Sequence, residues 1–171
     1  NAAITALPPR MKLDRLLVVH LRMHAGEAHK GPYMCKREAI ICLGRGDQRF
    51  PYRKVEIKDF ISRMKQLARE NDCDHVLPLV PRRFTSDAAL KAIVSGLDLE
   101  MHDLVSSRGM HPFYTLLIER SIATQAKVYV AEVSKTPLSM SMSETLQYQR
   151  RALNMSDIVD LNSTVPSVRI W

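Results

Sequence analysis

The chain has 171 residues, of which 46% are apolar and 25% are charged. This length suits one domain with its own hydrophobic core, and the composition is that of a globular protein rather than a disordered one. No apolar run reaches the ~20 residues that a membrane-spanning helix needs. The 3 cysteines are an odd number, which excludes a closed disulfide framework and favours a reducing compartment, so we expect a protein that is not secreted.

The net charge of +7 is unevenly distributed along the chain. Residues 1–84 carry 17 Lys and Arg against 9 Asp and Glu, whereas residues 85–171 carry 8 against 9. Basic residues concentrated in one half of a chain are typical of proteins that bind a polyanion. The same distribution occurs in proteins whose basic face packs against acidic subunits or anionic lipid head groups.

The first half of the chain begins with two segments that have the pattern of strands. Residues 15–23 alternate between apolar and polar positions, residues 34–44 form a second apolar segment, and we expect the two to pair as a hairpin with a long loop. Residues 45–54 are polar, basic and interrupted by Gly and Pro, which predicts a projecting loop. From Val55 to residue 72, apolar side chains recur every three or four positions, which predicts an amphipathic helix.

The second half alternates between short apolar strands and helical segments. Residues 73–81 predict a short strand, and Pro78 predicts that this strand lies at the edge of a sheet or is irregular, because proline has no N–H to donate. The remaining predicted elements are a helix from Thr85 or Ser86 to about Val105 with a break at Gly96, a helix that begins at Pro112, a strand at 126–133, and a helix from Met142 to about Leu153 preceded by a capping box of Ser141 and Glu144.

This order of elements predicts an α+β or mixed α/β fold with two layers, in which about four helices cover a roughly four-stranded mixed sheet. We expect a single globular domain over residues 15–153, preceded by an N-terminal extension at 1–14 and followed by a C-terminal tail at 154–171. The tail ends in the apolar residues Ile170 and Trp171, which favour burial against a neighbouring protein.

One stretch resembles the junction between two C2H2 zinc fingers. His20 and His24 would close one finger, and Tyr33 and Cys35 would open the next. Tetrahedral zinc in such a finger needs two thiolates about a dozen residues before the histidines, and residues 1–19 contain no cysteine. A site that combines these groups with Cys42 is disfavoured by the alternation of side chains along a strand. We therefore expect no bound metal.

The candidate catalytic groups are few. Cys73 lies two residues from His75, and His102 precedes Asp103, but neither pair has an evident third group to orient it. A glycine-rich phosphate loop, a GxSxG elbow and an HExxH pattern are all absent from the sequence. We therefore expect no enzymatic activity and no cofactor, with a small enzyme that uses Cys73 or a histidine as the third alternative.

The strongest remaining signal is the basic loop with its interleaved aromatic residues. Guanidinium and ammonium groups bind phosphates, and an aromatic ring can stack on an unpaired base. The candidate RNA-binding residues are Lys36, Arg37, Arg45, Arg49, Tyr52, Arg53, Lys54, Arg82 and Arg83.

These observations predict a non-catalytic structural subunit of an organellar ribonucleoprotein, most concretely a mitochondrial ribosomal or ribosome-associated protein. In this interpretation the first half contacts structural RNA, with ribosomal RNA as the expected class, and the second half and the tail contact neighbouring protein subunits. The alternative is an accessory subunit of a mitochondrial respiratory-chain complex or another membrane complex, in which the basic half contacts acidic subunits or lipid.

Overall fold

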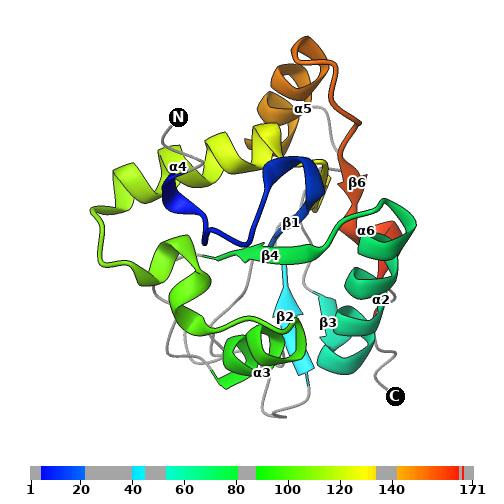
Figure 1. Cartoon of the computed structure of the whole chain (residues 1–171). Helices are drawn as coiled ribbons and strands as arrows, with labels where there is room; N and C mark the ends of the chain where they lie inside the picture. The colour runs from blue at the N-terminus through cyan, green and yellow to red at the C-terminus, as the bar shows by residue number, and fades with distance from the viewer. Residues whose placement is uncertain are drawn as a thin grey trace.

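The structure is a computed structural model that describes residues 5–21, 40–44, 53–80, 88–133, 142–165 and 167. These residues form a mixed α/β fold, which confirms the predicted class (Figure 1). The strands are β1 (Leu16–His20), β2 (Ile40–Leu43), β3 (Arg53–Glu56), β4 (His75–Leu79), β5 (Val128–Ala131) and β6 (Val159–Asp160). The helices are α2 (Ile57–Glu70), α3 (Ala88–Gly96), α4 (Pro112–Gln125), α5 (Met142–Ala152) and α6 (Leu161–Thr164), with short 3-10 turns η1 (Leu13–Arg15), η3 (Met101–Asp103) and η4 (Val105–Ser107).

The main sheet has four parallel strands in the order β4-β1-β5-β6. The sheet is therefore four-stranded as predicted, but it is purely parallel rather than mixed. Strand β1 lies in its interior, where Leu17 aligns with Val76 of β4 on one side and with Val128 of β5 on the other. Four of the five residues of β1 are buried, as expected for a strand that is covered on both faces.

The predicted hairpin between the first two strands is wrong. Strand β2 pairs antiparallel with β3, and the two form a separate sheet in which Ile41 aligns with Val55. Residues 53–56 were expected at the end of a loop and at the start of a helix, but they are the second strand of this hairpin. The error has a physical cause, because an apolar segment shows that a strand is buried and does not show which strand is its neighbour.

Helix α2 is the amphipathic helix that the apolar periodicity of the sequence predicted. It begins at Ile57, two residues later than predicted, because Val55 belongs to β3. Its buried residues follow the expected spacing, and Phe60 and Met64 are completely buried. Burying a side chain of this size contributes about 1.5 to 3 kcal/mol, so the apolar face of α2 stabilises its packing against the core.

Pro78 and Gly96 lie where the sequence indicated, in an edge strand and at the end of a helix. Pro78 lies in β4, the strand at one edge of the main sheet, where a missing N–H costs no ladder bond. Gly96 ends α3, and a Cβ atom at this position would lie 2.3 Å from Ile61 Cδ1 of α2. The predicted continuation of that helix to Val105 is wrong, since η3 and η4 follow instead.

The two pairs of helices lie on opposite sides of the main sheet. Helix α2 contacts α3, and α4 contacts α5. Figure 1 shows α4 and α5 above the sheet and α2 and α3 below it. Helices α4 and α5 occupy almost the predicted residues, and Pro112 is the first residue of α4. The capping box predicted from Ser141 and Glu144 lies outside the described side chains.

Segments expected to flank the domain contribute to its core. Leu161 and Val165 are completely buried, and β6 adds a fourth strand through the alignment of Val130 with Val159. At the other end, Leu7 and Met11 are buried in the same apolar cluster. A two-residue strand is too short to leave a periodic signal, which is why the sequence predicted a tail. Ile170 and Trp171 lie outside the described residues.

Arg150 is the largest side chain that is completely buried. Its guanidinium donates to the carbonyl oxygens of Ala123 and Ala126, both at 2.8 Å, and its Nε donates to the carbonyl of Ser156 at 2.9 Å. Burial lowers the pKa of Arg150 from its ordinary value. These bonds satisfy carbonyls at the C-terminal end of α4, where a positive charge also favours the helix dipole. Arg150 therefore attaches α5 to the junction between α4 and β5.

Within the parts of the chain that the structure describes, no helix combines the length and the apolar character that crossing a membrane would require.

Candidate functional site

The order of the main sheet reverses at β1. From β1 the chain moves first to β4 on one side, then returns past β1 to β5 on the other side, and continues outward to β6. The connections that leave the carboxyl ends of β1 and β5 therefore diverge. In open parallel α/β sheets, ligands bind in the crevice that this divergence creates. The topology alone thus marks the carboxyl ends of β1 and β5 as the candidate site.

Polar residues stand at this edge directly after buried apolar strands. His20 is the last residue of β1 and is half-buried. Glu132 follows β5 and is only 2% exposed, and Asp160 is the last residue of β6. Because Val19 aligns with Val130, the residues that follow them in β1 and β5 are also adjacent at the end of the sheet. The edge therefore carries an imidazole and two carboxylates.

Arg53 connects the β2–β3 hairpin to this edge. Its Nη1 donates to the carbonyl of Asn162 at 3.2 Å, and its Nη2 donates to the carbonyl of Leu161 at 3.4 Å. Burial lowers the pKa of Arg53, and the negative charges of Glu132 and Asp160 partly offset this effect. The Nε of Arg53 is buried and makes no hydrogen bond to the part of the protein that the structure describes. The guanidinium is thus fixed beside the carboxyl ends of β5 and β6, and its Nε–H is unpaired among the described residues.

Asp160 fixes the backbone around this group. One carboxylate oxygen, Oδ1, accepts from the backbone N–H of Val133 at 3.2 Å and from that of Asn162 at 3.1 Å. The second bond caps the short helix α6, whose carbonyls hold Arg53. The loop after β5, the start of α6 and the Arg53 side chain therefore form one connected polar assembly.

This assembly can hold a ligand that carries both negative and hydroxyl groups. Guanidinium and imidazole groups bind phosphate, and carboxylates accept hydrogen bonds from hydroxyls. In the sequence, β1 and β4 are followed within four residues by Arg22, Arg82 and Arg83, which lie outside the described residues.

Most of the predicted RNA-binding residues lie outside the described residues. These are Lys36, Arg37, Arg45, Arg49, Tyr52, Arg82 and Arg83. The structure places the other two on β3, where Lys54 is half-buried and aligns with Cys42. Arg53 is partly buried and bonded to protein carbonyls, so its guanidinium is not a solvated cation on an open loop.

Of the candidate catalytic pairs of the sequence, His102 and Asp103 are neighbours in the structure: the Nε2 of His102 lies 3.8 Å from Oδ1 of Asp103, and its Nδ1 lies 3.1 Å from Oε2 of Glu100. Burial raises the pKa of the Cys73 thiol, which is the opposite of the shift that activates a nucleophile. The nearest polar contact of its Sγ is the carbonyl of Asn71 at 3.7 Å. Asp103 is buried and bonded to Arg10 and to the N–H of Glu100, and so it acts as a structural anchor.

Two of the metal-ligand candidates lie in the described parts of the chain, His20 at the end of β1 and Cys42 in β2. Cys42 is disulfide-bonded, which the odd number of cysteines did not predict, while Cys73 is free. His24 and Cys35 lie outside the described residues. In the remainder, no three His, Cys, Asp or Glu side chains are grouped so that they could hold a metal ion.

Glu132 and Asp160 were not among the site residues predicted from the sequence. Both directly follow short apolar runs, VYVA and IV, and a polar residue at that position is the signal that could have revealed them. Its meaning depends on the strands being parallel and adjacent, which the sequence does not show.

No protein-family model, no curated protein and no solved structure matches this chain.

Proposed function

We propose that the chain is a ligand-binding α/β domain that holds a phosphate-bearing small molecule of the nucleotide class at the carboxyl ends of β1 and β5. The observation that carries this proposal is the reversal of strand order at β1, with His20 and the Arg53 assembly at that edge. A nucleotide carries phosphate and ribose hydroxyls together, which suits an edge that presents both cationic and carboxylate groups.

The direct test is ligand-dependent thermal stability. The protein is heated with ADP, GDP, UDP or inorganic phosphate, each at millimolar concentration and constant ionic strength. A nucleotide present at one hundred times its Kd stabilises the folded state by ~2.7 kcal/mol, which for a chain of this size raises Tm by about 5 to 10 °C. No shift with any nucleotide, and no heat of binding by calorimetry, would refute the proposal.

Substitutions then locate the site. His20→Ala and the double change Arg82→Ala/Arg83→Ala should each weaken nucleotide binding at least tenfold while leaving the Tm of the free protein nearly unchanged. Arg69→Ala is the matched control, because Arg69 is exposed in the last turn of α2, which leads to the amino end of β4. Equal loss of affinity in the control would indicate a general charge effect instead of a site.

The second candidate is the RNA-binding subunit predicted from the sequence, with a mitochondrial ribonucleoprotein as its setting. The uneven distribution of basic residues supports it. Replacing Arg45, Arg49 and Lys54 together by Ala should reduce the slope of log affinity against log salt by about two to three for a structural RNA. Tyr52→Ala should weaken binding by ~1 to 3 kcal/mol with little change in that slope. An accessory subunit of a membrane complex predicts neither effect on RNA and binding to anionic vesicles instead.

A further inference from the structure

The exposed large apolar side chains of the described chain gather on two neighbouring helices. Phe113 and Leu117 of α4 are 58% and 46% exposed, and Leu153, directly after α5, is 54% exposed. Contiguous apolar surface on a soluble domain marks a contact surface more often than a solvated one. The full set of exposed large apolar residues is Phe113, Tyr114, Leu116, Leu117, Tyr148 and Leu153.

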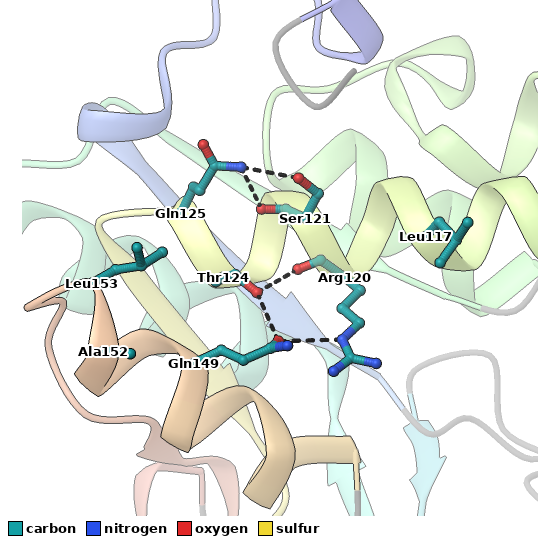
Figure 2. A pocket seen from close by; sticks show the side chains of 8 residues that line it. All are labelled: Leu117, Arg120, Ser121, Thr124, Gln125, Gln149, Ala152 and Leu153. Carbon is teal, nitrogen blue, oxygen red and sulfur yellow. Dashed lines mark hydrogen bonds between the residues drawn. The ribbon is translucent and has the colours of Figure 1, made fainter. Parts of the chain in front are cut away.

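A groove of about 620 Å³ runs between α4 and the C-terminal part of α5. Figure 2 shows Leu117 near one end of this groove and Leu153 near the other, with polar side chains between them. Its wall on α4 includes Ser121 and Thr124, and its wall on α5 includes Gln149. The groove therefore has apolar ends and a polar centre.

Arg120 is the charged residue of this groove. Its Nε donates to Gln149 Oε1 at 3.2 Å, and this bond holds the side chain against α5. Its Nη1 and Nη2 have no hydrogen-bond partner within the described parts of the chain, and in Figure 2 they point away from the other residues shown. A guanidinium held at one nitrogen and open at the other two is suited to a bidentate bond with a carboxylate.

We propose that this groove binds an amphipathic helix of a partner protein that carries an Asp or Glu opposite Arg120. Apolar residues one or two turns from that carboxylate would contact Leu117 and Leu153, which is the usual way in which a helix binds in a groove. The charge complementarity is specific, because the groove residues include one cation and no carboxylate.

The same residues disfavour two other occupants. Acyl chains would bury Ser121, Thr124 and Gln149 against lipid with no new hydrogen-bond partner, which is costly. A second copy that presented the same groove would bring no carboxylate to Arg120, because the residues that line the groove include neither Asp nor Glu.

The probe is a phage-displayed library of 16-residue helical peptides, selected on the folded protein with Arg120→Glu protein as the competitor. Enriched peptides should share a carboxylate placed three or four residues from an apolar residue. By fluorescence anisotropy, Arg120→Glu and Leu117→Asp should each weaken the best peptide at least tenfold, whereas Arg69→Glu should leave it unchanged. Replacing the peptide carboxylate by Lys should restore binding to Arg120→Glu.

Four outcomes would overturn the proposal. Enriched peptides without a shared carboxylate, or failure of the charge exchange to restore binding, would remove the role of Arg120. A dimer in light scattering that Leu117→Asp dissociates would identify a second copy as the occupant. Co-sedimentation with anionic vesicles that depends on Leu117 would identify lipid. Because Leu117 and Arg120 are at the surface, circular dichroism should show that both variants remain folded.

Discussion

Helices α2 and α4 have the same length, 14 residues, and are stabilised in opposite ways. Helix α2 buries its large apolar side chains, among them Phe60 and Met64, against the core. Helix α4 buries Thr115, Ile122 and Ala123, but leaves four large apolar residues exposed, namely Phe113, Tyr114, Leu116 and Leu117. Polar groups also bind both ends of α4, with the His111 side chain at its first turn and Arg150 at its last. Helix α2 therefore contributes mainly to the core, whereas α4 has an exposed apolar surface that is available for binding.

Phe60→Ala should give the largest effect. Phe60 is completely buried in α2, and removing a buried phenyl ring costs the burial energy and leaves a cavity. We expect a loss of ~3 to 5 kcal/mol in the free energy of unfolding, measured by urea denaturation. A loss below about 1 kcal/mol would mean that α2 is not held by its apolar face.

Arg150→Met should destabilise the protein by ~3 kcal/mol, because several buried carbonyls at the end of α4 would lose their donor. Arg151→Met is the control on the same helix. Arg151 is exposed and pairs with Asp157 at 2.8 Å, so its loss should cost less than about 1 kcal/mol. Equal effects of the two substitutions would contradict the anchoring role of Arg150.

Glu119→Gln should remove a pH dependence of stability. Burial raises the pKa of Glu119 from 4.5 to about 7 in the folded protein, so between these values the folded state binds more protons than the unfolded state. The free energy of unfolding should therefore fall as the pH rises from 4.5 to 7. At pH 8 the glutamine variant should be more stable than the parent by ~1 to 3 kcal/mol, with little difference at pH 4. Parallel stability curves across this range would contradict a raised pKa.

Phe113→Ala completes the comparison with the smallest effect. The phenyl ring is 58% exposed on α4, so its removal should change the free energy of unfolding by less than ~0.5 kcal/mol. The contrast with Phe60→Ala is the sharpest test of the difference between the two helices, because the substitution is chemically identical. Strong destabilisation would show that the first turn of α4 is packed rather than exposed.

Elements were predicted correctly where the interactions that form them join residues close together in the sequence. The positions of α2, α4 and α5 were predicted closely because helical hydrogen bonds join residues four apart and the apolar period is local. The pairing of β1 was not predicted, since Leu16 aligns with His75, far along the chain. The candidate site was missed for the same reason, because Glu132 and Asp160 lie near Arg53 only once β5, β6 and the hairpin are assembled.

The sequence by itself determined the mixed α/β class, the helix that begins at Pro112, the apolar face of α2 and the position of Pro78 in a short strand. Each depends on the conformation of a residue or on the spacing of its near neighbours. Tertiary structure alone decided the parallel order of the sheet, the burial of Arg150 and the exposure of the apolar residues of α4. The same apolar sequence can form a parallel or an antiparallel strand, and an arginine or a leucine can be buried or exposed. Only the packing of distant segments selects between these alternatives.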